Sequence, residues 1–256
     1  MRAQERITNN ILIEIKNYLD NGITLDRFTL RNLMGEIKNI PNIPEKLMVT
    51  ALAHGAAGSH KEAVSNFKCA TKYKDELVAI NYLAYLAIAG DYELYLIESV
   101  RLAREIISME LYANARNATY MDGDSEISSF FAQKAILMMS GNDRKEMEDE
   151  VRKRMQKLNS FAEVTKFSKK DISKLSNIVF GIAKKYSVNM FSCEFYTDFD
   201  GAEAAVIGDV ICMDSDILSS MDIDVATEIA IDPLFSDKPI TAWFRGADRK
   251  KLGDDI

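Results

Sequence analysis

Glycine-containing turns recur at nearly equal intervals through the middle of this chain. Gly58, Gly90 and Gly123 each precede a polar residue and a new helix-like segment, and the intervals between them are 32 and 33 residues. Glycine readily adopts the left-handed conformation that ends a helix. Turns at this spacing are typical of helix pairs that stack, because a single pair cannot bury its apolar faces alone. We therefore expect stacked helical hairpins over about residues 45–140.

The first of these units carries the clearest side-chain pattern. Residues 47–54 are apolar or small, and Ser59 lies three positions before Glu62, which is the spacing of a capping box at a helix start. The segment that follows places small, large and small side chains in turn on one helix face: Ala63, Phe67 and Ala70. Two antiparallel helices can approach closely at the alanines, and the phenylalanine then fills the gap toward the next pair.

Gly58, Ala63 and Phe67 resemble the turn glycine and the A-x3-F element of a tetratricopeptide repeat. The resemblance extends over residues 47–74 and implies a helical solenoid that binds protein partners, with Gly58, Ala63, Phe67 and Ala70 as structural repeat residues. In the next unit, Tyr95 and Ser99 stand where Ala63 and Phe67 stand in the first. An irregular α-bundle is therefore the alternative to a regular solenoid.

After Tyr186 the hydrophobic pattern changes from helical to alternating. Phe191, Cys193 and Phe195 alternate with polar residues, as in a strand, and Asp200-Gly201 separates this run from residues 204–207. An Asp-Gly pair between two such runs predicts a β-hairpin. Further strands are expected at 210–213 and 239–244, while 223–231 fits either a helix or a strand. The sequence thus predicts a mainly α protein: a helical-hairpin domain over residues 1–160 and a small acidic α+β domain over residues 161–256.

Charge is distributed unevenly along a chain whose net charge is −7. Residues 188–256 contain 5 Lys or Arg and 15 Asp or Glu, whereas residues 144–187 contain 12 and 6. We expect the basic segment to pack beside the acidic domain and partly neutralise it, leaving excess acid for a basic protein partner. The expected partner-binding residues are Asp214, Asp216, Asp222, Asp224, Trp243 and Arg245. The alternative for Trp243 is that it anchors the core of the small domain.

Two other functions have to be weighed against protein binding. The acidic residues of 198–216 could hold the Mg²⁺ of a nuclease or phosphoryl-transfer enzyme. However, residues 188–237 contain no Lys or His, and Ala202 stands where a calcium loop would need an oxygen ligand. The basic segment 144–185 could bind nucleic acid, but its cations lie on several helix faces among acids. We therefore expect no metal site.

The remaining motifs give no support to catalysis. His54 and His60, the only histidines, lack the spacing of a metal site, and Cys69, Cys193 and Cys212 form no CxxC pair. We expect no cofactor, no catalytic residue, no membrane segment and a reducing, cytoplasmic location. The sequence is best interpreted as a non-catalytic protein–protein interaction module, such as a bacterial regulator, chaperone or toxin-neutralising protein.

Overall fold

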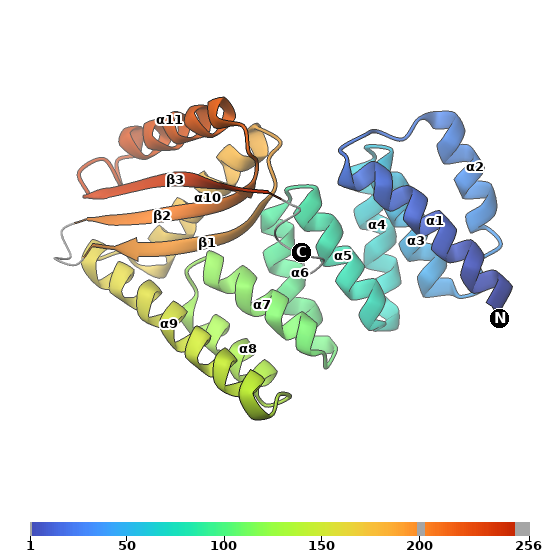
Figure 1. The fold of residues 1–256 in the computed structure, drawn as a ribbon, viewed down its shortest axis with the longest axis horizontal. Helices are drawn as coiled ribbons and strands as arrows, with labels where there is room; N and C mark the ends of the chain where they lie inside the picture. The colour runs from blue at the N-terminus through green and yellow to red at the C-terminus, as the bar shows by residue number, and fades with distance from the viewer. Residues whose placement is uncertain (1, 199–202, 249–256) are drawn as a thin grey trace. The chain divides into compact units, whose positions relative to one another are not determined.

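The computed structural model describes residues 2–198 and 203–248, and its backbone forms two compact units (Figure 1). The first unit contains the residues up to Asp91 together with 104–106, and the second contains 92–103 and the chain from Ile107 onward. The first unit holds α1 (Arg2–Asp20), α2 (Arg27–Ile37), α3 (Ile43–Ala56), α4 (His60–Ala70), the 3-10 helix η1 (Thr71–Tyr73) and α5 (Glu76–Ile88).

The second unit combines helices with a small sheet. Its helices are α6 (Tyr92–Glu105, whose last turn is counted with the first unit), α7 (Met109–Met121), α8 (Ser125–Ile136), α9 (Gly141–Thr165), α10 (Lys169–Lys185) and α11 (Ser215–Ile231), and its strands are β1 (Met190–Thr197), β2 (Ala204–Ile211) and β3 (Ile240–Ala247). The expected fold class, mainly α with a small C-terminal α+β part, is confirmed. The two units divide the chain near residue 91, whereas the expected boundary at residue 160 falls inside α9.

Three helices end in the same hydrogen-bonded turn, at the three glycines that the sequence singled out. Gly58, Gly90 and Gly123 have φ angles of 75°, 64° and 79°. The residue after each glycine donates its amide to a carbonyl five positions back: Ser59 to His54, Asp91 to Leu86 and Asp124 to Thr119. This 6→1 bond is the Schellman arrangement, and it satisfies a carbonyl that the helix end leaves free. The turn prediction is therefore confirmed at all three positions.

The first unit is built around the α3–α4 hairpin, in which the pattern of small and large residues has the expected effect. Ala63, Phe67 and Ala70 are fully buried. The Phe67 ring stacks on Tyr82 of α5 with a centroid separation of 4.9 Å. Phe67 thus joins the hairpin to the following helix. The tetratricopeptide resemblance itself stays a prediction.

Of the two capping boxes in the sequence, one is formed and one is not. Ser168 and Asp171 exchange the reciprocal bonds of a capping box at the start of α10. The box expected at Ser59 and Glu62 is wrong, because no side-chain bond from Ser59 caps α4. The ψ angle of Ser59 is 67°, which departs from the extended backbone of most N-caps, and its amide serves the preceding turn instead.

The sheet has the strand order β1-β2-β3, with β1 antiparallel to β2 and β2 parallel to β3. The hairpin expected between β1 and β2 is present in this pairing, but its Asp200-Gly201 turn lies outside the described residues. The separate strand expected at 210–213 is wrong: β2 continues to Ile211 without a break. The ambiguous segment 223–231 belongs to α11, which connects β2 to β3.

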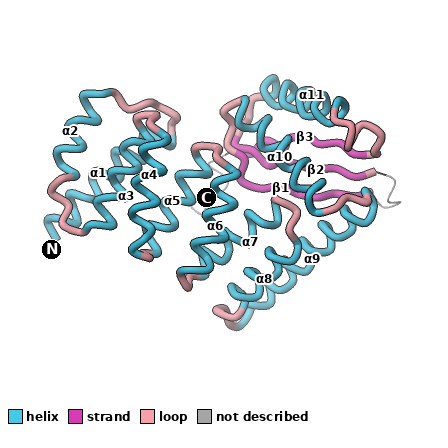
Figure 2. The backbone as a smooth tube through the Cα atoms, turned by 180° about the vertical axis from the view of Figure 1, so that it is seen from behind, coloured by secondary structure: helices cyan, strands magenta, loops and turns pink. Residues whose placement is uncertain are grey.

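One face of the sheet carries the core of the second unit. Phe195, Val206, Ala242 and Phe244 are buried there and belong to one apolar cluster with residues of α9, α10 and α11. Figure 1 shows α10 behind the strands, and Figure 2, seen from the opposite side, shows it in front of them. Phe191 is absent from this cluster because a β-bulge between Met190 and Ser192 shifts the register.

We expect Phe67→Ala to lower the free energy of unfolding by about 3–5 kcal/mol, because it removes burial and leaves a cavity. Phe28→Ala is the matched control, since Phe28 is 73% exposed, and it should change stability by less than about 0.5 kcal/mol. Urea unfolding followed by circular dichroism measures both. Equal midpoints for the two variants would contradict the packing described above.

A second matched pair tests the close contact between α3 and α5. A Cβ on Gly55 would lie 2.3 Å from Cε2 of Tyr85, whereas one on Gly35 of α2 meets no atom within 4 Å. Gly55→Ala should therefore destabilise the protein by about 1–3 kcal/mol, since the buried tyrosine must move. Gly35→Ala should stabilise it by about 0.5–1 kcal/mol through helix propensity. Thermal unfolding of both variants gives the signs, and a stabilising Gly55→Ala would refute the contact.

Candidate functional site

The side of the sheet opposite the core carries a set of large and charged side chains. Residues that pair across strands point to the same face, so the rows of the ladder define this surface. We call it the outer face, and its rows are Tyr196–Ala205–Thr241, Glu194–Ile207–Trp243 and Ser192–Asp209–Arg245. None of these residues belongs to the apolar core cluster. Figure 1 views the sheet from the side opposite α10.

Trp243 is a half-buried member of this outer face. Its neighbours Ala242 and Phe244 are buried in the core, and the two-residue period of a strand then directs Trp243 to the other side. Tyr196, which lies on β1, is 47% exposed. The core cluster does not include Trp243, and this large aromatic is partly exposed on the second unit.

A chain of ion pairs crosses the outer face. The Arg245 guanidinium donates from Nε to Asp209 Oδ1 at 2.7 Å and from Nη2 to Glu194 Oε2 at 3.2 Å. Lys157 of α9 also donates to Glu194, and these bonds lower the pKa of the Glu194 carboxyl. The cluster contains two cations and two carboxylates, so it adds no net charge to the face. Its bonds hold Arg245 in one place, two residues from Trp243 on the same face of β3.

The four aspartates that were expected to form a free acidic patch serve different local purposes. Asp214 is the N-cap of α11 and accepts from the amides of Asp216 and Ile217. Asp222 accepts from the Phe244 amide at 2.7 Å, and Asp224 binds Lys185 and the Tyr186 hydroxyl, each at 2.7 Å. Asp216 is exposed in the first turn of α11. Local contacts thus account for three of these acids without any partner.

The basic segment does lie against the acidic one. Lys157, Lys174 and Lys185 form ion pairs with Glu194, Asp232 and Asp224. All three acids belong to the acidic segment 188–256, so the expected partial neutralisation is confirmed. These three lysines are engaged within the unit, which weakens the nucleic-acid alternative for residues 144–185.

Among the residues with described positions, no group of three His, Cys, Asp or Glu is placed to hold a metal ion. Asp198 Oδ1 accepts from the Glu203 amide, and Asp209 is paired with Arg245. Asp200 lies outside the described residues. Among the located acids of 198–216, the Asp198, Asp209 and Asp214 carboxylates therefore make separate local bonds.

His60 lies in a polar chain that sequence spacing did not reveal. Its Nδ1 is 2.8 Å from Tyr85 Oη, and its Nε2 is 3.0 Å from Asp91 Oδ2. Burial, together with the charge of Asp91, raises the pKa of Tyr85 to about 12, so the hydroxyl stays protonated. A neutral imidazole protonated at Nε2 satisfies both contacts. The three residues connect α4, α5 and the turn after α5. These contacts are therefore explained by a structural role, which is to hold the three segments together.

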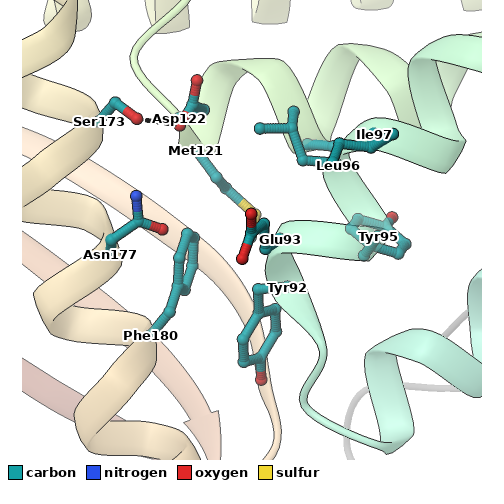
Figure 3. A pocket seen from close by; sticks show the side chains of 11 residues that line it. Tyr92, Glu93, Tyr95, Leu96, Ile97, Met121, Asp122, Ser173, Asn177 and Phe180 are labelled. Atoms are coloured by element: carbon teal, nitrogen blue, oxygen red, sulfur yellow. Dashed lines mark hydrogen bonds between the residues drawn. The ribbon is translucent and has the colours of Figure 1, made fainter. Parts of the chain in front are cut away.

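A pocket of about 440 Å³ lies within the second unit, between α6, α7 and α10 (Figure 3). Its apolar wall includes Met121, Leu96 and the stacked rings of Tyr92 and Phe180, whose centroids are 4.8 Å apart. Its polar groups include Asp122, Ser173, Asn177 and Glu93. The sequence analysis missed this pocket, because its residues come from three helices and share no local motif.

The pocket's Asp122 carboxyl is partly buried and incompletely neutralised. Ser173 donates to its Oδ1 at 2.5 Å. Burial raises the pKa of Asp122, while the Ser173 bond and the charge of Lys169 act in the opposite direction. The Lys169 ammonium is itself bound to Asp124. The pocket thus contains a carboxylate that has lost water without gaining a direct ion pair among the described contacts.

Comparisons with known proteins yield no relative: no family model, curated protein or solved structure matches this chain. No helix in the described ranges has the length and apolar character needed to cross a membrane.

We expect Asp222→Ala to remove the hydrogen bond that the Phe244 amide donates at the edge of β3. Loss of this bond leaves the Phe244 amide without its carboxylate and should cost about 1 kcal/mol of stability. The exchange rate of that amide with deuterium should rise, which NMR measures at the residue. Asp237→Ala is the control, because Asp237 is an exposed acid of the nearby turn. If Phe244 exchanged equally fast in both variants, Asp222 would not protect the strand edge.

Proposed function

We propose that this chain is a non-catalytic protein-binding module that recognises its partner through the outer face of the sheet. The observation that carries the proposal is the position of Trp243, which is directed away from the core and remains partly exposed. Tryptophan, tyrosine and arginine are the residues in which the binding energy of interfaces is concentrated. Trp243, Tyr196 and Arg245 bring all three types onto one side of a three-stranded sheet.

The arrangement of polar groups on the outer face supports the same proposal. Ile207 lies between Glu194 and Trp243 in one row but is only 7% exposed, so the apolar surface offered to a partner comes from Trp243 and Tyr196. The ion pairs of Arg245 with Asp209 and Glu194 lie beside this row. An apolar centre beside fixed polar groups is the usual composition of a protein interface. Because Arg245 is already held by two carboxylates, little side-chain entropy is lost when a partner covers it.

The face is a better binding surface than the edges of the sheet. At one edge, the Tyr92 hydroxyl binds both the amide and the carbonyl of Met190. At the other, Asp222 binds the amide of Phe244. At these two positions a partner strand cannot pair with the backbone, because the groups are already bonded. Side-chain contacts on the outer face therefore support the proposal more directly than strand addition does.

We assign the partner to the class of basic proteins. The segment 188–256 has 15 acids and 5 bases, and the three lysines that pair with it from the preceding helices leave it strongly acidic. Such a surface accelerates association with a positively charged partner. Tetratricopeptide-like hairpins in the same chain fit this role, because stacked helix pairs serve as binding scaffolds. A cytoplasmic bacterial regulator, chaperone or toxin-neutralising protein has this combination of properties.

The experiment compares proteins captured from the native host by the full chain and by Trp243→Ala. The wild-type chain should retain a basic protein, and the variant should bind that protein more than about tenfold more weakly, since truncation removes the central aromatic. Tyr73→Ala is the control, because Tyr73 is 53% exposed but belongs to the other unit. Unfolding midpoints establish that both variants fold.

Surface plasmon resonance on the purified pair then gives the rates. The association rate should fall as salt rises, because the attraction is screened over a Debye length of about 10 Å at 0.1 M salt. Undiminished affinity in Trp243→Ala would exclude the outer face as the binding surface. An association rate independent of salt would exclude a basic partner guided by the acidic segment.

A further inference from the structure

The pocket of the second unit is large enough for a small organic molecule. Its volume is about 440 Å³, which lies within the range of about 300–1,000 Å³ that is typical of ligand sites. The residues that line it come from α6, α7 and α10, and all belong to the same compact unit. It lies apart from the outer face and is not needed for the protein-binding function proposed above.

The lining of the pocket decides the charge of a suitable ligand. Two carboxylates, Asp122 and Glu93, line it, and no Lys, Arg or His does so. In Figure 3, the Glu93 carboxylate points toward the middle of the pocket, while Asp122 lies at the end nearest Ser173. An anionic ligand would be repelled by both acids. A ligand with a positive charge would instead compensate for the water that Asp122 has lost.

The lining also indicates which uncharged groups the ligand should carry beside its positive charge. Tyr92 and Phe180 present a stacked aromatic pair, and Met121 and Leu96 add apolar surface. Aromatic rings attract cations and also bury apolar groups. A bare metal ion would gain little here, because much of the wall offers no oxygen ligand. The chemistry favours an ammonium group that is attached to an apolar or aromatic body.

A local constraint fixes the Asp122 end of the pocket. A Cβ on Gly123 would lie 2.3 Å from Cγ2 of Ile172, so only glycine allows the α7–α8 turn to approach α10 this closely. Gly123 also has a φ of 79°, which disfavours other residues. This approach brings Asp122 within 2.5 Å of the Ser173 hydroxyl. The carboxylate is therefore held in place before any ligand arrives.

We propose that this pocket binds a small organic cation, a primary amine on an apolar or aromatic body, with its ammonium group beside the Asp122 carboxylate. The body of the ligand lies against Tyr92, Phe180 and Met121. Asn177, at the exposed rim, is available for a further hydrogen bond.

The ionisation of Asp122 makes binding depend on pH. Because burial raises the pKa of Asp122 above its ordinary value, the folded protein takes up this proton at a higher pH than the unfolded chain does. As pH falls through that raised pKa, the free protein gains stability and the amine loses its partner. The other groups that act on Asp122 are the cation of Lys169 and the acid of Asp124, which are bound to each other, and the Ser173 hydroxyl.

The test uses three probes of similar shape and different charge on the full-length chain. Calorimetry at pH 7 should give saturable binding of 2-phenylethylamine, with a dissociation constant on the order of 1 mM for so small a molecule. Neutral 2-phenylethanol should bind at least about tenfold more weakly, and 3-phenylpropionate should not bind. Equal affinity for the amine and the alcohol, or no saturable binding of the amine, would overturn the proposal.

Substitutions in the pocket test whether the amine binds there. Asp122→Asn keeps the shape and the Ser173 contact, and it should weaken amine binding at least about tenfold, while the unfolding midpoint at pH 7 stays equal or rises. Ile97→Lys provides a second variant at an exposed lining position and should repel the amine. Asp237→Asn, at an exposed acid outside the pocket, is the charge-matched control and should bind as the wild type does. Unchanged affinity in both pocket variants would place the amine elsewhere.

Discussion

The second unit depends on one constraint: its three strands have helices against one face, so each strand must sort its side chains between a covered side and an open side. Phe195, Val206 and Phe244 lie on the covered side with the core cluster. Because successive residues of a strand point to opposite faces, the neighbours of these residues point to the open side. Glu194, Ile207 and Trp243 form a row on the opposite side because the core residues occupy the first.

The hydrogen bonds of the second unit change the interpretation of the acidic C-terminal segment. Its carboxylates were read from the sequence as one surface, but several are components of the fold. Asp214 starts a helix, Asp222 protects a strand edge and Asp224 anchors Lys185. Composition reports how many charges a segment has, whereas hydrogen-bond geometry decides which of them remain for a partner. The partly exposed side chains of Tyr196 and Trp243 are therefore a more specific indicator of a binding surface than the net charge.

Local patterns were reliable guides wherever the physical cause was itself local. The glycine turns and the burial of Ala63, Phe67 and Ala70 both depend on residues within a few positions, and both were predicted. The prediction failed at Ser59, where the preceding Schellman turn competes for the same residue. It also failed at residues 210–213, because the end of a strand is set by its neighbours in the sheet.

The pocket illustrates the opposite case. Tyr92, Met121 and Phe180 are 29 and 59 residues apart along the chain, and each reads as an ordinary helix residue. The periodicity of a helix predicts that a residue faces inward, but not which distant residue it meets. The place of Trp243 is different, because its neighbours Ala242 and Phe244 are apolar and a strand at 239–244 directs alternate residues to opposite faces.

The two edges of the sheet explain why side chains, and not strand pairing, dominate its surface chemistry. A sheet of three strands has two edge strands, and each exposes backbone groups that invite another chain. Tyr92 closes one edge at Met190, and burial raises the pKa of its hydroxyl, so that it remains a donor as well as an acceptor. Asp222 closes the other at Phe244, at the cost of a carboxyl whose pKa burial raises. Both residues are at least partly buried, at some cost to their charged forms, and each satisfies backbone groups at one position of a sheet edge. The binding function proposed above therefore depends on the side chains of the outer face.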